Sequence, residues 1–366
     1  MARDGNLVAI VDGDETMPWA AASLCLQKSQ VLASNLDAVV WAEKPLMTLD
    51  RLICSALANA PAGFQVFSQS ARRLAPALPL SSQLRLRLEF SGLLLFTESL
   101  EALAASALLE SPFDDAAILV AGGHGEWSDC ALGTGRAGNV EFSTQIDFPH
   151  SLSALWNIFS HYLGAAPAAI AERSLHGSPS FSEALGELVD LKEDGSFRLD
   201  LGYFDFYTRA APRCARLESL FGGPPLPARA PWSGREADIA ASLQKLTEEI
   251  LRRMAAEARR RSRTAELCVA GSIVANRPAM ERLKADSPAG FFVAPAAGAA
   301  QRAAGAALLG SRRTFHTPRP RPGSQAQSPA ASLPLAQRTA ADTAFDVVID
   351  LALGAVYYLG FAVYSL

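Results

Sequence analysis

The chain has 366 residues, of which 49% are apolar and 19% charged; this composition excludes a disordered protein and favours a globular chain of two or more structural units. The net charge of −4 argues against a general nucleic-acid binder, whose surface should be basic. Five cysteines without paired spacing argue against a disulfide framework or a zinc finger, and predict free thiols in a reducing, cytoplasmic compartment. No charged segment followed by a long apolar run opens the chain, so we expect no signal peptide.

The first part of the chain predicts short elements. Residues Asn6–Val11 are a candidate strand, Pro18–Lys28 a helix with proline in its first turn, and Asp37–Trp41 a second strand. Residues 61–94 carry several arginines and leucines without a clear period. They predict a helical connector with a solvated basic face.

A longer segment, residues 95–164, contains the strongest signals. Leu95–Leu109 is apolar and alanine-rich, which favours a helix, and Ala116–Ala121 has the pattern of a buried strand that ends in glycines. A turn over residues 133–139 joins a further strand pair, and Ser151–Leu163 predicts a helix that ends at Gly164. A strand that ends in a glycine-rich turn can present bare backbone N–H groups to a phosphate.

The third quarter of the chain alternates between helix and strand patterns. The clearest helix covers residues 233–263, because Ser233 and Glu236 form a capping-box pattern at its start. A strand over Leu267–Ala270, a helix over Ala279–Lys284 and a strand over Phe291–Val293 follow. This alternation predicts a parallel or mixed sheet with helices packed on it.

The end of the chain changes composition. Residues 311–342 are rich in Arg, Pro, Ser and Ala and predict a linker, and an apolar segment covers residues 343–366. Three interpretations of residues 347–366 stay open. They form a tail anchor at the inner face of a membrane, with the arginines of the linker on the cytoplasmic side. Alternatively, they form a packed terminal helix or strand, or they are an accidental extension of the chain.

Several segments carry a resemblance to known enzymes: Leu36–Leu46, Ser111–Ala117, Gly125–Trp127, Phe148–Leu152 and Asp194–Asp200. They resemble one family, the O-carbamoyltransferases of nodulation-factor and antibiotic biosynthesis. The resemblance covers about residues 36–310 and implies an α/β fold of the ribonuclease H-like, actin-like ATPase superfamily, with two lobes of mixed sheets flanked by helices. Residues 1–310 would form this domain, with a truncated start.

The family's metal ligands do not have counterparts here. The resemblance implies iron held by two histidines at His-x-x-x-His spacing on a helix and by two aspartates on loops. Flanking residues place these ligands at Ser99 and Leu103, at Gly122 and at Ala299. Alanine, glycine and leucine side chains cannot coordinate a metal, and four replacements together should abolish the site. We therefore expect neither iron nor ATP, the family's cofactors, to serve this chain.

His124 is the one new candidate for chemistry in this neighbourhood. It is either a ligand or general base beside Glu126, or a polar loop residue near a strand end. Cys130 together with His124 and Asp129 would form a thiol nucleophile, although residues so close in sequence do not establish a triad.

Four further positions are candidates for substrate or nucleotide contacts. Asn276 either contacts a nucleotide or sugar, or caps the next helix. Gly123, Glu126 and Gly298 are either parts of a former site or ordinary turn residues.

Three hypotheses for function follow. The first is a carbamoyltransferase homologue whose activity is impaired or lost; the family transfers a carbamoyl group from carbamoyl phosphate, through carbamoyl-adenylate, to a hydroxyl of a sugar or natural product. The second is a non-catalytic scaffold or binding subunit, held to a membrane by its tail. The third is a metal-independent enzyme served by a separate carbamoyl-activating protein.

Overall fold

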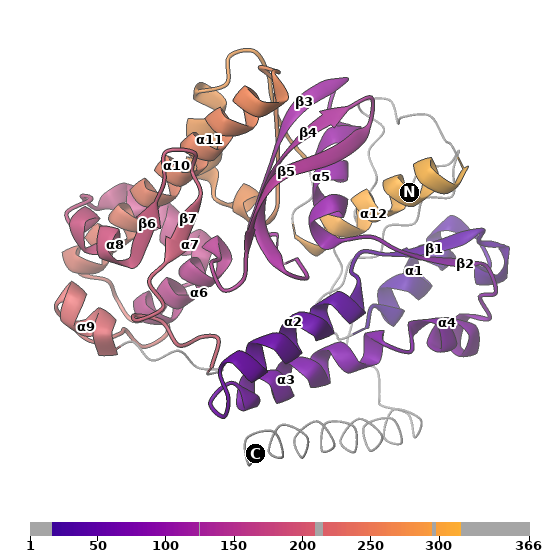
Figure 1. The fold of residues 1–366 in the computed structure, drawn as a ribbon, viewed down its shortest axis with the longest axis horizontal. Helices are drawn as coiled ribbons and strands as arrows, with labels where there is room; N and C mark the ends of the chain where they lie inside the picture. The colour runs from indigo at the N-terminus through magenta and orange to yellow at the C-terminus, as the bar shows by residue number, and fades with distance from the viewer. Residues whose placement is uncertain (1–16, 124, 209–214, 295–297, 316–366) are drawn as a thin grey trace.

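The computed structural model describes residues 17–123, 125–208, 215–294 and 298–315 (Figure 1). The predicted strand Asn6–Val11, the candidate His124 and the apolar segment 343–366 lie outside the described residues, as does most of the predicted linker.

A mixed five-stranded sheet forms the centre of the molecule, in the order β5-β4-β3-β8-β9. β4 pairs antiparallel with both of its neighbours, whereas β3, β8 and β9 run parallel. β3 is apolar and buried along nearly its whole length, as expected for a strand with helices on both faces. The strands are β3 (Asp115–Ala121), β4 (Ser128–Arg136), β5 (Asn139–Asp147), β8 (Leu267–Ala270) and β9 (Phe291–Val293).

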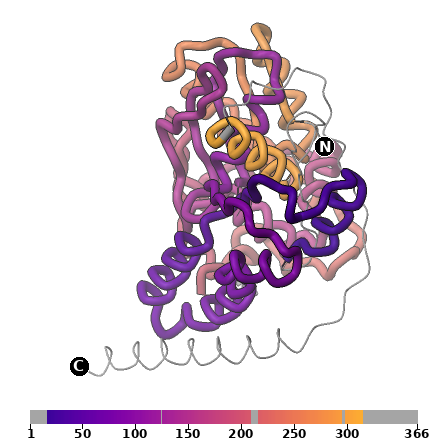
Figure 2. The backbone as a smooth tube through the Cα atoms, turned by 90° about the vertical axis from the view of Figure 1, so that its right-hand side faces the viewer, coloured from indigo at the N-terminus to yellow at the C-terminus, as the bar shows by residue number. Residues whose placement is uncertain are grey.

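Helices cover both faces of this sheet, so the expected α/β architecture with a mixed, helix-flanked sheet is confirmed. On one face lies α5, which α12 covers in turn (Figure 2). Gly305 of α12 allows this close approach, because a Cβ atom there would collide with the carbonyl oxygen of Ala102. The helices are α5 (Ser99–Glu110) and α12 (Ala299–Phe315) on this face, and α6 (Leu152–Leu163), α7 (Pro167–Arg173), α10 (Gly234–Ser262) and α11 (Arg277–Ala285) on the other.

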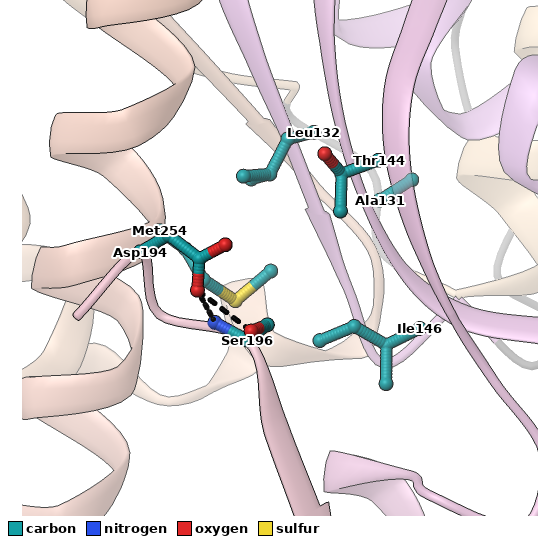
Figure 3. A pocket seen from close by; sticks show the side chains of 7 residues that line it. All are labelled: Ala131, Leu132, Thr144, Ile146, Asp194, Ser196 and Met254. Carbon is teal, nitrogen blue, oxygen red and sulfur yellow. Dashed lines mark hydrogen bonds between the residues drawn. The ribbon is translucent and has the colours of Figure 1, made fainter. Parts of the chain in front are cut away.

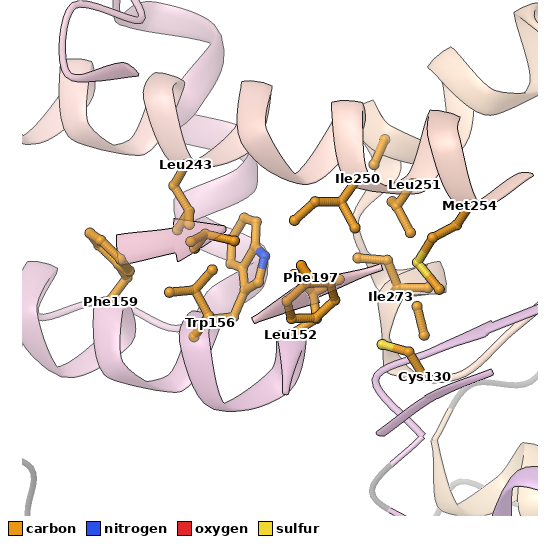
Figure 4. Packing of buried hydrophobic residues seen from close by; sticks show 14 of the residues in the cluster. Cys130, Leu152, Trp156, Phe159, Phe197, Leu243, Ile250, Leu251, Met254 and Ile273 are labelled. Carbon is orange, nitrogen blue, oxygen red and sulfur yellow. The ribbon is translucent and has the colours of Figure 1, made fainter. Parts of the chain in front are cut away.

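The largest apolar core lies between α10, α6 and the sheet (Figure 4). Trp156 of α6 lies in it and donates from Nε1 to Thr247 Oγ1 of α10 at 3.0 Å. The predicted capping box of α10 is confirmed, with Ser233 N donating to Glu236 Oε2 at 2.8 Å. α10 packs along β3 and β4, so its apolar side is buried against the centre of the sheet.

A smaller unit precedes the sheet. Its two strands pair in parallel, and helices pack around them. It consists of α1 (Trp19–Ser29), β1 (Ala38–Trp41), α2 (Pro45–Ala58), α3 (Phe64–Leu74), α4 (Leu80–Leu88) and β2 (Leu93–Phe96). The remaining elements are α8 (Ser182–Leu188), α9 (Ala215–Phe221), β6 (Val189–Leu191) and β7 (Phe197–Leu199), with the 3₁₀ turns η1 (Ala33–Asn35), η2 (Ala75–Ala77), η3 (Ser174–His176) and η4 (Ser272–Ala275).

Two boundary predictions were wrong. The helix expected to begin at Leu95 begins at Ser99, because Leu93–Phe96 pairs with β1 as a strand; this long-range pairing overrides the local helix preference. The predicted turn over residues 133–139 contracts to Ala137 and Gly138, which have positive φ angles of 47° and 79°. Gly135 belongs to β4, where the side chain of Leu108 fills the space that a Cβ atom would need.

Most other sequence predictions for the described residues hold. The strands over Ala116–Ala121, Leu267–Ala270 and Phe291–Val293 are present, and so are the helices predicted near Pro18–Lys28, Ser151–Leu163 and Ala279–Lys284. α12 extends to Phe315, so the first residues of the predicted linker are helical. None of the helices in the described ranges has the length and apolar character to cross a bilayer.

Candidate functional site

The candidate site lies where the adjacent parallel strands β3 and β8 end. Gly122 follows β3 with φ of +70°, and Gly271 follows β8 with φ of +101°. Ser272 N donates to Gly122 O at 2.9 Å and joins the two turns. From these neighbouring strands the chain departs in opposite directions: β3 is followed by β4 on one side, and β8 by β9 on the other. This makes their ends a topological switch point, which is where ligands usually bind to open α/β sheets.

The four positions implied to hold metal ligands come from three elements around this point. Ser99 and Leu103 lie in α5 and are buried, with Leu103 packed in the same cluster as Val120 of β3. Gly122 follows β3, and Ala299 begins α12, the helix that packs on α5.

These four positions do not fit an iron ion. Ser99 Oγ is the only side-chain atom at these four positions that could coordinate a metal. This hydroxyl donates a hydrogen bond to the carbonyl oxygen of Ala42 at 3.1 Å. In the part of the chain that the structure describes, no group of three or more His, Cys, Asp or Glu residues is arranged to hold a metal. The sequence candidate His124 lies outside that part.

Glu126 is a carboxylate next to this point, and two helix starts use it. Its Oε1 accepts hydrogen bonds from Lys44 N at 2.8 Å and from Ser99 N at 3.1 Å. Lys44 precedes α2 and Ser99 begins α5, so one side chain satisfies N-terminal N–H groups of two helices. Burial raises the pKa of the Glu126 carboxyl, while the N–H groups of Lys44 and Ser99 act in the opposite direction.

Arg51 strengthens the same junction. Its Nε donates to the carbonyl oxygen of Glu126, and its guanidinium lies over the ring of Phe148, 5.1 Å from the centroid. Arg51 belongs to α2, so this side chain joins the smaller unit to the segment that precedes α6.

Asp129 and Cys130 belong to β4, and Asp129 lies beside the start of α6. Asp129 accepts from Ser153 N at 3.1 Å and from Ser153 Oγ at 2.8 Å, and thereby caps the helix. The Cys130 thiol is fully buried, and its pKa is raised well above the ordinary value, first by burial and then by the charge of Asp129. Such a thiol stays protonated at neutral pH, so its surroundings oppose the nucleophile hypothesis.

The glycine-rich turns use their backbone N–H groups internally. Gly123 N donates to Asp129 O at 2.8 Å, and Gly125 N to Ser128 O at 3.0 Å. Gly271 N donates to the side-chain Oε1 of Gln301, also at 3.0 Å. The sequence predicted bare N–H groups for a phosphate, and these three groups are not bare.

Asn276 occupies a helix cap. Its Oδ1 accepts from Ala279 N at 3.1 Å, and its amide pairs reciprocally with Gln244 of α10, at 2.8 and 3.1 Å. Both polar atoms of the side chain are therefore engaged within the protein. Gly298 lies just before α12, where its carbonyl accepts from Arg302 N at 3.1 Å.

Sequence reasoning missed two glutamines. Both are buried. Gln301 binds Gly271, which follows β8, and Gln244 binds Asn276, which follows the 3₁₀ turn η4. No local signal distinguishes them, because each lies in a helix of ordinary composition and its partner is about 30 residues away.

A crevice between β4, β5 and α10 lies apart from these residues (Figure 3). Asp194 at its edge accepts from Ser196 N at 3.0 Å and Ser196 Oγ at 2.6 Å, and these bonds lower the pKa of the Asp194 carboxyl. The crevice is too narrow for a water molecule, so it does not compete as a ligand site.

Comparison with known proteins gives two findings. The model of the family described as "Carbamoyltransferase N-terminus" matches residues 12–308. An uncharacterized protein of Synechocystis sp. is 33% identical over 331 residues, which cover 84% of this chain and 54% of the relative. The chain thus spans about half the length of this curated relative.

Proposed function

The chain belongs to the carbamoyltransferase N-terminus family, and we propose that it is a member that does not carry out metal-dependent carbamoyl transfer. In the family, as the resemblance implies, a carbamoyl group passes from carbamoyl-adenylate to a hydroxyl group, which forms a carbamate ester and releases AMP. Iron would hold the acceptor or polarise the carbamoyl group.

One observation carries the proposal. The positions implied for the iron ligands are occupied by Ser99, Leu103, Gly122 and Ala299, which bring a single hydroxyl that already donates to Ala42. The nearby carboxylate of Glu126 accepts from two helix starts. A metal there would need Glu126 to give up these hydrogen bonds, and one carboxylate alone rarely holds iron.

The proposal includes the fold of the family. We assign the chain to the ribonuclease H-like, actin-like ATPase superfamily. The mixed five-stranded sheet with helices on both faces supports this assignment, and so does the parallel strand pair of the smaller unit.

Metal content and AMP release test the proposal together. The purified full chain is supplied with Fe²⁺, carbamoyl phosphate, ATP and a panel of sugars whose free hydroxyl groups can accept the carbamoyl group, with a separate carbamoyl-activating protein in a parallel sample. We expect substoichiometric iron and no AMP release above the sample without the chain. Iron-dependent AMP release would overturn the proposal. Release that needs the activating protein but not iron would establish the metal-independent enzyme instead.

A second candidate is a non-catalytic binding subunit. Leu46 and Leu57 of α2 are 73% and 62% exposed, and eleven residues, about three helical turns, separate them, so they share one helix face. The partner we propose is a carbamoyl-activating protein. The double variant Leu46→Glu/Leu57→Glu should abolish its binding in calorimetry. The variant Leu175→Glu, at a site 70% exposed in η3, should not.

The place of the protein in the cell is also a proposal. We propose a cytoplasmic protein, since its cysteines lack paired spacing. The family resemblance suggests a role in a biosynthetic pathway. If residues 347–366 anchor the protein at the inner face of a membrane, the full chain should sediment with membranes. A chain that ends at residue 340 should then stay in the supernatant.

A further inference from the structure

Part of the smaller unit is basic, although the chain as a whole is acidic. Residues 61–88 contain four arginines and no acidic residue, whereas the net charge of the chain is −4. The helical connector predicted there is present as α3 and α4, which carry all four arginines. Arg72, Arg73, Arg85 and Arg87 are exposed, so their charge lies on the surface of these two helices.

The helix α4 carries leucines on two opposite faces. Leu80 and Leu84 are 2% and 5% exposed and pack in an apolar core of the smaller unit. Leu78 and Leu86 are 42% and 84% exposed. Leu78 has helical φ and ψ angles of −64° and −45°, so the helical period places it on the same outer face as Leu86, eight residues later. A surface helix usually presents polar side chains to water on that face.

Arginines accompany these outward leucines. Arg85 follows Leu78 by seven residues, or about two helical turns, and therefore belongs to the same face. Arg73 lies near the end of α3, and only Leu74 and the turn η2 separate it from Leu78. In the ranges that the structure describes, neither Arg73 nor Arg85 forms an ion pair. Both guanidinium groups can therefore bind an external anion.

The outer side of α4 is held in place from within. The guanidinium of Arg87 lies 5.1 Å from the ring centroid of Trp19 in α1, and Gln83 Nε2 donates to Pro76 O at 3.0 Å. Figure 1 shows α3 and α4 along the lower part of the molecule, away from α10 and α11. The exposed leucines and arginines are thus preformed on one outer side of the protein.

We propose that Arg73, Leu78, Arg85 and Leu86, the α4 face, bind the surface of an anionic phospholipid bilayer. Each arginine near such a surface contributes about fivefold in affinity, and its guanidinium matches the lipid phosphate. The two leucines enter the boundary between head groups and acyl chains. A nucleic acid would bind the arginines but would leave the leucines without an apolar partner. This site is separate from residues 347–366 and from any carbamoyl transfer.

Flotation of the full-length protein with vesicles tests the proposal. The vesicles contain phosphatidylcholine alone, or phosphatidylcholine and phosphatidylserine in equal parts. We expect at least tenfold tighter binding to the anionic vesicles. Raising the salt from about 0.1 M to about 1 M should remove this preference, because the Debye length falls from about 10 Å to about 3 Å. Arg73→Glu/Arg85→Glu should also remove it, Arg73→Lys/Arg85→Lys should keep it, and Leu78→Ser/Leu86→Ser should weaken binding to the anionic vesicles at least threefold.

The matched control is Lys245→Glu/Lys284→Glu, which makes the same change in net charge at exposed positions of α10 and α11 and should bind like the wild type. Equal binding by the arginine reversal and this control would overturn the proposal and assign vesicle binding to another part of the chain. Unchanged binding by the leucine variant would also contradict it. Arginine-dependent binding to polyglutamate but not to vesicles would indicate an acidic protein partner instead. Thermal unfolding checks each variant, and Arg73→Gln/Arg85→Gln replaces the reversal if that protein does not fold.

Discussion

The carboxylate of Glu126 accepts a hydrogen bond at 2.8 Å from the backbone N–H of Lys44, a residue 82 positions earlier in the chain. The same oxygen accepts from Ser99 N at the start of α5. The first N–H groups of a helix have no partner within the helix, so a buried start needs an outside acceptor. Glu126 supplies it for α5 and for the segment that leads into α2, and thereby fixes the smaller unit to the sheet.

Substitution of Glu126 should therefore destabilise the protein through the two N–H groups. Glu126→Leu keeps an apolar volume but leaves Lys44 N and Ser99 N without their acceptor, at a cost of about 1–3 kcal/mol for each unsatisfied group. Glu126→Gln keeps one amide oxygen as an acceptor and should lose less. Urea unfolding at pH 7 measures the difference. If Glu126→Leu were as stable as the wild type, the contacts with Lys44 and Ser99 would not matter for stability.

The central sheet could be predicted because its signals are local. Residues Ala116–Ala121 and Leu267–Ala270 are uninterrupted apolar runs that end in glycine, which is typical of a strand buried on both faces. Leu93–Phe96 is also an apolar run, but it is partly exposed, no glycine follows it, and the alanine-rich helix behind it obscured its end. Its identity as a strand depends on β1, 55 residues earlier in the chain, and no local pattern contains that pairing.

The site was predictable in its position but not in its contacts. The sequence located Gly123, Glu126 and Asn276 near strand ends, and it left open whether each bound a ligand or served the fold. The answer depends on distant partners such as Lys44 for Glu126 and Gln244 for Asn276. Such partners come together only through the tertiary fold, so one sequence does not reveal them.

Asn276 provides a second prediction, because the nucleotide and capping interpretations differ in outcome. Asn276→Ala removes the cap of α11 and the amide pair with Gln244, and should destabilise the protein by about 1–3 kcal/mol. The double variant with Gln244→Ala should cost less than the sum of the single ones, by about 0.5–3 kcal/mol, since the two amides share hydrogen bonds. Chemical denaturation of the four proteins measures this coupling. Unchanged stability together with altered ATP binding would instead support a nucleotide contact.

His150 predicts a pH dependence. Its Nδ1 accepts from Leu199 N at 3.1 Å, which requires the neutral ring, and burial together with the charge of Arg198 lowers its pKa below the usual 6.5. Between the lowered pKa and 6.5 the unfolded chain binds more protons at this residue than the folded protein does. The stability that His150 contributes is therefore complete above pH 6.5 and declines as the pH falls through that window.

The matched control for this prediction is His150→Gln, which keeps an acceptor but does not titrate. Thermal unfolding between pH 8 and pH 5 should show the wild type losing stability relative to His150→Gln on acidification. A constant difference across this range would show that Leu199 N does not depend on the charge state of His150.

Gly122 supports the last prediction, because the position implied for a metal-binding aspartate is now a constrained turn. Its φ of +70° is strained for a residue with a side chain, and a Cβ atom would collide with Ser272 Oγ and lie 3.2 Å from Ser153 Oγ. Gly122→Ala should therefore destabilise the protein by about 1–3 kcal/mol. Adding Ser272→Ala should recover the part of the lost stability that comes from the collision, but not the part that comes from the backbone strain.

Gly186→Ala is the control. This exposed glycine lies within α8 with no atom near its Cβ position, so alanine should stabilise the protein by about 0.5–1 kcal/mol. Denaturant unfolding decides; if Gly122→Ala behaved like Gly186→Ala, the turn after β3 would adapt easily and could accept a larger residue.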